Sequence, residues 1–286
     1  MTEILRYAAF TATPTGGNPA GVVLDARGLD EATMRTIATD LGHPETAFVV
    51  PGEDGALRVR YFSGGSVSIE VPFCGHATIA TAVAHAERHG PGRLDLDTVA
   101  GRVVVRTTPG AAGAPPSATL TSVPPRVDLV SRSHLQEALA ALRWDPTDLD
   151  PRLPPRIADA GARHLVLAAL TRARLAALDY DVPRLRAFLE ELGLVTVALV
   201  HRRRPDGLVF DVRNPFPTGG IHEDPATGAA AAALGGYLRE EELVAVPARL
   251  TLHQGVDLGR PSLLVVDVPA ERGSGIDVTG TAVPIG

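Results

Sequence analysis

The sequence predicts an α+β protein of two similar halves, each a curved or barrel-like, mostly antiparallel sheet around one central helix. The 286 residues suit two domains of about 140 residues each. With 29 glycines, 24 prolines and only 4% aromatic residues, many short elements joined by tight turns are expected. Both halves contain an Ala-rich apolar stretch without a polar stripe, "HATIATAVAHA" from His76 and "PATGAAAAALGGYL" from Pro225. Because a helix that is apolar all round belongs inside a domain, each half should wrap its sheet around one.

Alternating apolar and polar residues, separated by turn residues, define the elements of the first half. Asp30 stands directly before an amphipathic stretch and is placed to cap its helix. We predict strands at residues 5–11, 21–25, 46–50, 57–62, 93–98 and 102–107, and helices at residues 30–41 and 76–89.

The stretch "TTPGAAGAPPSATLTSVPP", residues 107–125, interrupts this pattern with closely spaced prolines and glycines. We therefore predict that the chain crosses between its two domains here. The first domain takes residues 1–116 and the second takes residues 117–276. A last strand near residues 277–286 is a candidate to return to the first domain.

The second half repeats the style of the first. Asp224 followed by Pro225 is a common helix opening, with Asp as the N-cap and Pro at the first helical position. Aligning Ala77-Thr78 with Ala226-Thr227 brings out an internal echo between the two Ala-rich helices. We predict further helices at residues 132–142 and 181–192, and strands at residues 163–169, 194–200, 207–212, 248–253 and 262–268.

Two features of the composition exclude whole classes of chemistry. The sequence has no lysine, so its 27 basic residues are all arginine, which excludes Schiff-base enzymes, lysine-anchored pyridoxal-phosphate enzymes and P-loop phosphate sites. The single cysteine, Cys74, excludes an intrachain disulfide, a Cys-x-x-Cys redox pair and a multi-cysteine zinc site. A mechanism that needs two thiols is excluded for the same reason.

The charge pattern gives no sign of a nucleic-acid or membrane partner. The net charge of -6 is spread along the chain, and the basic run at residues 201–204 precedes Pro205-Asp206-Gly207, which indicates a solvated turn. No apolar stretch approaches the roughly 20 residues of a membrane span, and the first twenty residues lack a basic segment leading into an apolar one. We expect a soluble, cytoplasmic protein.

Local sequence leaves the roles of the candidate site residues open. His76 falls in the first turn of its helix, where the positive end of the helix dipole favours a neutral imidazole. Cys74 is either a nucleophile activated by that helix N-terminus or a buried packing residue, and Glu45 is either a site residue or an exposed glutamate. His85 and His89 have metal-chelating i, i+4 spacing but lack the HExxH order, so we predict no metal site.

Five stretches, read together, resemble the phenazine-biosynthesis PhzF-like family. They are "GNPAGVV" (17–23), "ETAFVV" (45–50), "EVPFCGHATIATA" (70–82), "EDPATGAA" (223–230) and "QGVDLGRPS" (254–262). They occur in the order and at the approximate spacing of that family and span nearly the whole chain. The family is similar to diaminopimelate epimerase and proline racemase, which implies two domains, each a barrel-like sheet around a central helix, with the active site between them.

The resemblance also implies roles for particular residues. Glu45 matches the acid/base residue that, in the family's characterised isomerase, moves a proton between two carbons of a dihydro-hydroxyanthranilate. His76 and Asp224 match residues that hold and polarise the substrate. Asn18, Gly75, Ala77, Gly228 and Ala229 match positions around a small carboxylate-bearing substrate. No cofactor is implied, and a homodimer is expected.

The chain also departs from the family pattern. Ala229 replaces a serine whose hydroxyl could bind the substrate carboxylate, and "FSGGSVSIE" (62–70) replaces a shorter approach to Glu70. We therefore expect a cofactor-independent isomerase with a changed substrate. The alternatives are a racemase or epimerase that pairs Glu45 with another non-thiol base, and a small-molecule-binding or protein-interaction member of the fold that has lost catalysis.

Overall fold

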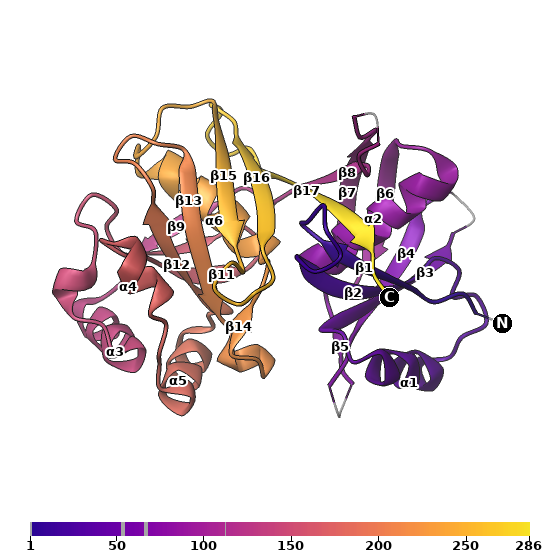
Figure 1. The fold of residues 1–286 in the computed structure, drawn as a ribbon, viewed down its shortest axis with the longest axis horizontal. Helices are drawn as coiled ribbons and strands as arrows, with labels where there is room; N and C mark the ends of the chain where they lie inside the picture. Colours follow the sequence, from indigo (N-terminus) through magenta and orange to yellow (C-terminus); the bar gives the residue numbers. More distant parts are fainter. Residues whose placement is uncertain (1, 53–54, 66–67, 112) are drawn as a thin grey trace. The chain divides into compact units, whose positions relative to one another are not determined.

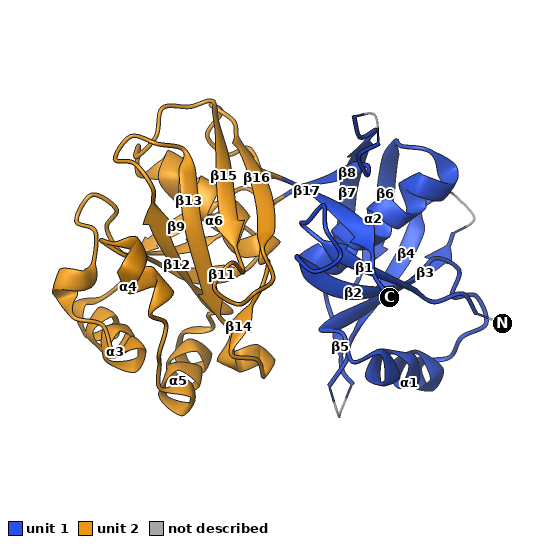
Figure 2. Ribbon diagram, in the orientation of Figure 1, with its two compact units in different colours: residues 1–121, 279–286 blue, residues 122–278 orange. Residues whose placement is uncertain are grey.

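The computed structural model in Figure 1 describes residues 2–52, 55–65, 68–111 and 113–286. The chain divides into two compact units (Figure 2), unit 1 with residues 1–121 and 279–286 and unit 2 with residues 122–278. Residues 117–121, which we assign above to the second domain, form a strand of unit 1 because they pair with the strand that precedes them. Among the described residues no helix is both long and apolar enough to cross a membrane.

Unit 1 is a closed barrel of eight strands among its described residues. The ring runs through β1 (Leu5–Ala9), β2 (Asn18–Val23), β3 (Glu45–Pro51), β4 (Leu57–Ser63), β6 (Arg93–Thr98), β7 (Gly101–Thr108), β8 (Ser117–Thr121) and β17 (Asp277–Pro284), and β17 pairs back with β1. The pairs β2–β3 and β4–β6 are parallel, and the pairs that join them are mostly antiparallel. Closure removes the exposed strand edges that would otherwise invite aggregation.

The Ala-rich helix α2 (Gly75–His89) fills this barrel. Every residue from His76 to Ala84 is buried, as expected for a helix with no polar stripe. Helix α1 (Glu31–Leu41) lies on the outside, where the Asp30 side chain accepts a hydrogen bond from the backbone N–H of Thr33. The short strand β5 (Glu70–Val71) pairs with β4 and leads the chain into α2.

Unit 2 repeats the arrangement of strands around a helix. Its sheet neighbours, in order, are β9 (Arg126–Leu129), β10 (Arg156–Asp159), β11 (Arg163–Ala168), β12 (Thr196–Arg202), β13 (Val209–Pro215), β15 (Ala248–Gln254) and β16 (Ser262–Val268). β14 (Glu223–Asp224) pairs with β13 just before helix α6 (Gly228–Glu240), which is buried from Ala230 to Arg239. The predicted α+β class with two similar domains is confirmed.

The remaining elements of unit 2 cover the outer side of its sheet. They are α3 (Arg132–Leu142), α4 (Arg172–Ala176), α5 (Val182–Leu192) and the short 3-10 turns η1 (Pro146–Asp148) and η2 (Pro217–Gly219). Leu139 and Leu142 of α3 and Leu185 and Leu189 of α5 pack in one apolar cluster with residues of β11 and β12. This cluster fixes the strands whose ends carry the polar groups of unit 2.

The two units share a sequence repeat that the structure places in register. "EVPFCG" begins at Glu70 and "EDPATG" begins at Glu223, each leading into the buried helix of its unit. Each glutamate pairs with an arginine ten residues earlier, Arg60 with Glu70 and Arg213 with Glu223. Gly75 therefore corresponds to Gly228.

Two local predictions about this repeat are wrong. Asp224 does not cap α6, because it belongs to β14 and the helix begins at Gly228 with Thr227 as its N-cap. The repeat register matches Ala77 with Ala230, and not with Ala226 as predicted, a shift of four positions. Runs of alanine fit several alignments almost equally well, whereas the Arg–Glu pairs fix only one.

Candidate active site

Three chemically different side chains meet at the entrance of the helix in unit 1. Glu45 is the first residue of β3, Cys74 is the N-cap of α2, and His76 lies in the first turn of that helix. The Cys74 Sγ lies 3.5 Å from Glu45 Oε2, to which the thiol can donate, and 3.4 Å from His76 Nδ1. His76 Nε2 lies 3.3 Å from Glu45 Oε2. The candidate acid/base therefore has two polar contacts from the start of one helix.

Neighbouring hydrogen bonds hold the start of α2 in place. The hydroxyl of Thr78 donates to the Cys74 carbonyl at 2.7 Å and lies 2.6 Å from the hydroxyl of Tyr61 on β4. The backbone N–H of Thr78 also donates to the Cys74 carbonyl. These contacts tie the helix N-terminus to the barrel wall, so the Cys74 and His76 side chains are positioned by rigid elements.

The imidazole of His76 is neutral at physiological pH. Burial lowers the pKa of His76 to about 3, the nearby His43 adds to the decrease, and a hydrogen bond with the backbone of Pro19 opposes it. The 3.3 Å contact with Glu45 is thus a polar contact with an uncharged ring, not a salt bridge between two charges. A neutral imidazole can orient a carboxyl group or a substrate without competing for the transferred proton.

Asp224 is the centre of a second polar cluster, in unit 2. Its carboxylate accepts a hydrogen bond of 2.5 Å from the Thr227 hydroxyl, and its backbone carbonyl accepts one of 2.7 Å from Gln254 Nε2. Gln254 also donates to the Thr227 hydroxyl at 3.0 Å and accepts from the Thr227 backbone N–H at 3.1 Å. We did not predict Gln254 as a site residue, although it begins the quoted "QGVDLGRPS" stretch.

A buried polar chain lies at the strand ends beside Asp224. The hydroxyl of Thr196 donates to Asn214 Oδ1 at 3.1 Å and accepts from His164 Nδ1 at 2.8 Å. All three side chains are fully buried, and Asn214 sits opposite Asp224 in the β13–β14 ladder. These hydrogen-bonded side chains link β11, β12 and β13 at one end of the sheet. No feature of the sequence indicates this.

The sequence repeat shows which residues take equivalent positions in the two units. In the ladder between β3 and β4, the backbone of Arg60 lies opposite Phe48. In the ladder between β12 and β13, the backbone of the equivalent Arg213 lies opposite Leu199. Counting back three residues from Phe48 and from Leu199 gives Glu45 and Thr196, the first residues of β3 and β12.

The same register matches the N-cap Cys74 with the N-cap Thr227, and His76 with Ala229. Unit 1 therefore carries a carboxyl, a thiol and an imidazole at positions where unit 2 carries two hydroxyls and a methyl. Neither hydroxyl can act as an acid or base near neutral pH. The two halves have the same framework but different chemistry.

Comparison with known proteins identifies the family. The model of the PhzC-PhzF family, described as phenazine biosynthesis-like protein, matches residues 7–286. The chain belongs to this family.

Relatives of this phenazine biosynthesis-like protein cover nearly all of its length. A Deinococcus radiodurans protein named "Uncharacterized isomerase" is 36% identical over 283 residues, covering 97% of this chain and 90% of its own. The trans-2,3-dihydro-3-hydroxyanthranilate isomerase of Pseudomonas chlororaphis is 30% identical, covering 100% of this chain and 98% of its own. A PhzF-family crystal structure from Bacillus anthracis matches with a TM-score of 0.87 and 27% identity, covering 99% and 98% of the two chains. The chain is an isomerase of this family.

The other predicted substrate-binding positions of this isomerase differ in exposure. Asn18, the first residue of β2, and Ala77 in α2 are fully buried. Gly75, Gly228 and Ala229, in the first turns of α2 and α6, are partly exposed. Their backbone N–H groups belong to the unpaired set at a helix N-terminus, which suits a carboxylate. Of the departure at residues 62–70, residues 66–67 lie outside the described part of the chain.

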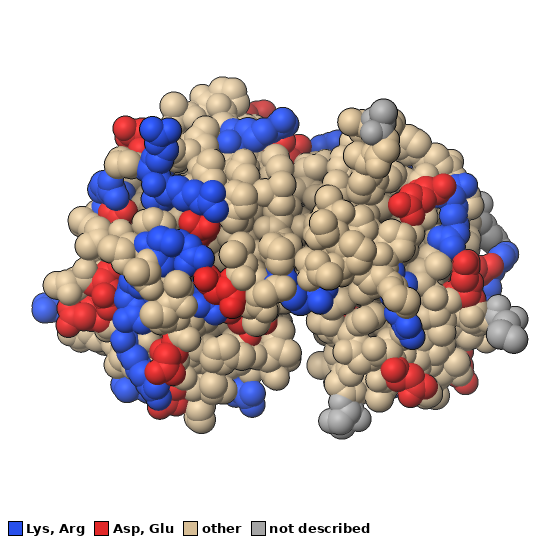
Figure 3. All heavy atoms as spheres, in the orientation of Figure 1, with Lys and Arg blue, Asp and Glu red and all other residues tan. Residues whose placement is uncertain are grey.

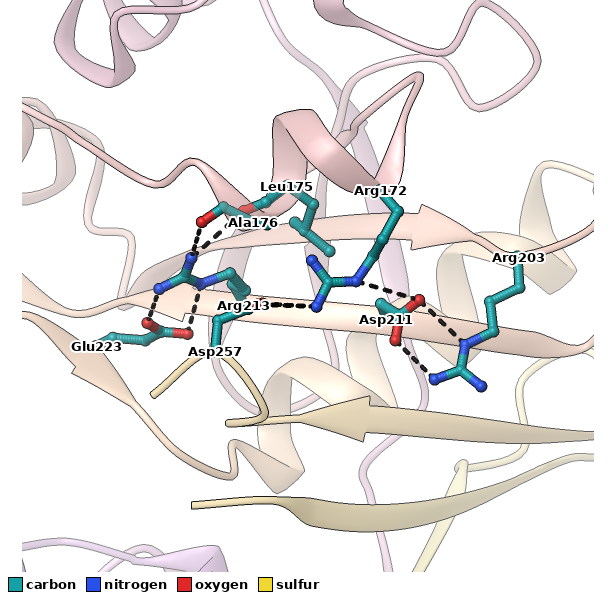
Figure 4. Close-up of polar contacts among 8 residues, drawn as sticks. All are labelled: Arg172, Leu175, Ala176, Arg203, Asp211, Arg213, Glu223 and Asp257. Atoms are coloured by element: carbon teal, nitrogen blue, oxygen red, sulfur yellow. Dashed lines mark hydrogen bonds and ion pairs between the residues drawn. The ribbon is translucent and has the colours of Figure 1, made fainter. Parts of the chain in front are cut away.

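A buried ion pair involves Glu223, the residue that directly precedes Asp224 (Figure 4). Arg213 of β13 binds Glu223 of β14 through two hydrogen bonds, of 2.9 Å and 2.5 Å. It also donates to the backbone carbonyls of Leu175 and Ala176 in α4. Because Glu223 directly precedes Asp224, this clamp fixes the backbone that presents the Asp224 carboxylate.

Two arginines of the basic run at residues 201–204, Arg202 and Arg203, bind partners within unit 2. Arg203 pairs with Asp211 at 2.8 Å, and Arg172 lies 3.6 Å from the same carboxylate (Figure 4). Arg202 donates to the backbone carbonyl of Gly207 at 2.8 Å. Figure 3 shows basic and acidic side chains interspersed on the face that it displays. A surface that binds nucleic-acid phosphates would instead need one continuous basic area.

Replacing Gln254 by Leu tests the unit 2 cluster in this isomerase. The change removes three hydrogen bonds and leaves buried polar groups of Asp224 and Thr227 without them, so we expect a loss of about 1–3 kcal/mol in the free energy of unfolding. Urea denaturation monitored by circular dichroism measures it. Arg249→Ala, on the same strand but in an exposed ion pair with Asp267, is the control and should cost less than about 1 kcal/mol. Equal losses in the free energy of unfolding of the two variants would contradict a stabilising role for the hydrogen bonds of Gln254.

His164 predicts a pH dependence of stability. Burial lowers the pKa of His164 to about 3, below its unfolded value near 6.5. The unfolded state therefore binds more protons at His164 between these values. The contribution of His164 to stability is constant above pH 6.5 and falls as the pH drops through this window, by up to about 1.4 kcal/mol per pH unit. Urea denaturation at pH 7 and pH 5 should show a smaller acid-induced decrease for His164→Gln than for the wild type. An identical decrease in the two proteins would show that His164 already carries its proton at pH 5.

Proposed function

We propose that this isomerase moves a proton within a small carboxylate-bearing substrate and that Glu45 is its single acid/base group. The observation that carries the proposal is the asymmetry of the repeat. A titratable carboxyl beside a thiol and a neutral imidazole occurs in unit 1, and the positions equivalent to Glu45, Cys74 and His76 hold Thr196, Thr227 and Ala229 in unit 2.

The proposed reaction starts with the ionised Glu45. Its carboxylate takes a proton from one carbon of the substrate, and the electron pair of the broken C–H bond moves into the conjugated system next to the substrate carboxylate. The protonated Glu45 then returns that proton to a second carbon, which restores its own charge. Because one group removes and replaces the proton, both steps take place on the same face of the substrate.

The groups around Glu45 support this role. His76 is neutral and 3.3 Å from the carboxyl, so it can hold Glu45 in one orientation without taking its proton. The N-terminus of α2, with the partly exposed Gly75, offers backbone N–H groups and a positive dipole end to the substrate carboxylate. We propose that Asp224 orients the same substrate, as the family resemblance implies.

The substrate is proposed from the relatives. One named relative is a trans-2,3-dihydro-3-hydroxyanthranilate isomerase, which makes that compound the first to test. Ala229 provides no hydroxyl for a substrate carboxylate, so we expect this compound to bind more weakly than in an enzyme with serine there, by about 1–2 kcal/mol for one lost hydrogen bond.

An epimerase with two opposed bases is less consistent with these observations. It needs a second group that takes up or releases a proton on the opposite face, and the repeat position of the N-cap Cys74 carries the hydroxyl of Thr227. A member of the fold that only binds ligands would have no need for the contacts that orient the Glu45 carboxyl.

The experiment that tests the proposal is an isomerisation assay. The purified protein is incubated with trans-2,3-dihydro-3-hydroxyanthranilate and followed by absorbance and proton NMR. We expect an isomerised product at a rate proportional to enzyme concentration. If neither this compound nor a panel of small conjugated carboxylates isomerises or exchanges a proton with solvent, the proposed proton transfer is wrong.

A further inference from the structure

The triad at the entrance of α2 has the dimensions of a metal site. The distances are 3.5 Å from Cys74 Sγ to Glu45 Oε2, 3.3 Å from Glu45 Oε2 to His76 Nε2 and 3.8 Å from Cys74 Sγ to His76 Nε2. In a tetrahedral zinc site, ordinary Zn–S, Zn–N and Zn–O bonds place neighbouring ligand atoms roughly 3.3–3.6 Å apart. The three atoms are therefore as close together as the ligands of one tetrahedral site. Because Cys74 Sγ also lies 3.4 Å from His76 Nδ1, the imidazole ring must rotate for Nε2 to bind the same metal as the sulfur.

The chemistry of the three groups suits a particular class of metal. A thiolate, an imidazole and a carboxylate together favour Zn²⁺ and similar divalent transition ions, whereas Mg²⁺ and Ca²⁺ require oxygen ligands. Cys74 is at a helix N-terminus, which stabilises the thiolate that a metal needs. Cys74 and His76 are buried at the start of one helix, so little ordering is needed to bring the ligands together.

We propose that Glu45, Cys74 and His76 form a three-ligand site for Zn²⁺ or a similar divalent transition ion, and that its occupation blocks the acid/base function of Glu45. On binding, the Cys74 thiol releases its proton to solvent and the sulfur bonds to the metal, so one thiolate and one carboxylate balance the two positive charges. The fourth coordination position takes water or a substrate carboxylate. Metal binding itself does not depend on the proposed isomerase reaction, and only the inhibition does.

Unit 2 provides an internal comparison for this site. The positions equivalent to the three ligands carry the hydroxyls of Thr196 and Thr227 and the methyl of Ala229, which do not hold a transition metal. One ion per chain is therefore expected at the repeat positions. A competing site to control for is the pair His85 and His89 at the end of α2, whose ring centroids are 4.4 Å apart.

The test is a titration of the chelator-treated protein with Co²⁺, which takes the place of Zn²⁺ and absorbs light when a thiolate binds it. We expect one equivalent of Co²⁺ to produce the charge-transfer absorption of a Co²⁺–thiolate bond, and added Zn²⁺ to remove it. Cys74→Ser should abolish this absorption. His76→Asn and Glu45→Gln should each weaken Co²⁺ binding by at least about 100-fold. Loss of a residue that only supports a metal ligand already lowers metal affinity by about 10–100-fold, and these two residues would bind the metal directly.

The double variant His85→Ala/His89→Ala is the matched control and should retain both the absorption and the stoichiometry. Circular dichroism of each variant establishes that it is folded. If Cys74→Ser does not fold, Cys74→Ala replaces it. Any of three results would overturn the site. They are a wild-type spectrum without thiolate absorption, absorption that persists in Cys74→Ser, and loss of the absorption in His85→Ala/His89→Ala. If the site binds Co²⁺ but no substrate is found, only the proposed function fails. If turnover is found and Zn²⁺ leaves it unchanged, the inhibitory role is wrong.

Discussion

Glu45→Gln is expected to lower kcat/KM by about 10³-fold or more, because the amide cannot take up and return a proton. General acid–base catalysis contributes about 10²–10⁴-fold, and a 10³-fold loss corresponds to about 4 kcal/mol of transition-state stabilisation. The replacement has nearly the same shape and can still accept from the Cys74 thiol, so the fold should be preserved. Steady-state kinetics with a saturating substrate series measures the loss.

The split between kcat and KM distinguishes a proton-transfer role from a binding role. We expect kcat to account for most of the loss in Glu45→Gln, because the carboxylate acts on the reacting carbon. Glu137→Gln, which removes an exposed ion pair with Arg184 on the outside of unit 2, is the control and should leave both constants unchanged. A Glu45→Gln enzyme with wild-type kcat would assign the base to another residue.

Arg213→Met is expected to cost about 3–5 kcal/mol in the free energy of unfolding. The change leaves the Glu223 carboxylate, whose side chain is 0% exposed, buried without its partner, and it removes donors from two backbone carbonyls. Urea denaturation gives the value. Should the variant not fold, Glu223→Gln provides a milder version, because it keeps the shape of the side chain and removes only its charge.

The repeat supplies a matched control for this prediction. Arg60→Met breaks the equivalent pair in unit 1, where the Arg60 and Glu70 side chains are 26% and 23% exposed, so water can replace the lost partner. We expect a cost of about 1 kcal/mol there, near the range of surface pairs. Replacing both Arg213 and Glu223 by Met should recover part of the loss, since no charge stays buried. Equal costs in the two units would show that burial does not decide the strength of this clamp.

Much of the fold was predictable because its signals are local. The Asp30 cap, the amphipathic α1 and the two apolar helices each depend on residues within one or two turns, and the predicted helix from residue 76 begins one residue later than α2 does. The sequence does not predict β9 and β10 because each strand directly follows a Pro-rich stretch, and β9 pairs with β10, which lies beyond α3 and η1 in the sequence. Asp224-Pro225 was misread since β14 pairing with β13 holds Asp224 extended, which overrides its preference for a helix cap.

The candidate site was less predictable than the fold. Local sequence left Glu45 and His76 open, and only the family resemblance assigned them roles. Their meeting with Cys74 depends on β3 beginning beside the start of α2. Glu45 and Cys74 are 29 residues apart in the sequence, and this spacing does not indicate that they are in contact. Gln254 lies 30 residues from Asp224, and the partners in the His164, Thr196 and Asn214 chain are 32 and 18 residues apart. Such contacts arise from sheet register, which short motifs do not encode.

The most direct test of a single acid/base group is the stereochemistry of deuterium in the product formed in deuterated buffer. Deuterium enters to the extent that the protonated Glu45 exchanges its proton with solvent before it returns one. The account predicts this deuterium only at the carbon that receives the proton, on the face from which the first proton left, and no product from Glu45→Gln. Deuterium on the opposite face, or inversion at the original carbon, would require a second base and would contradict the central role of Glu45.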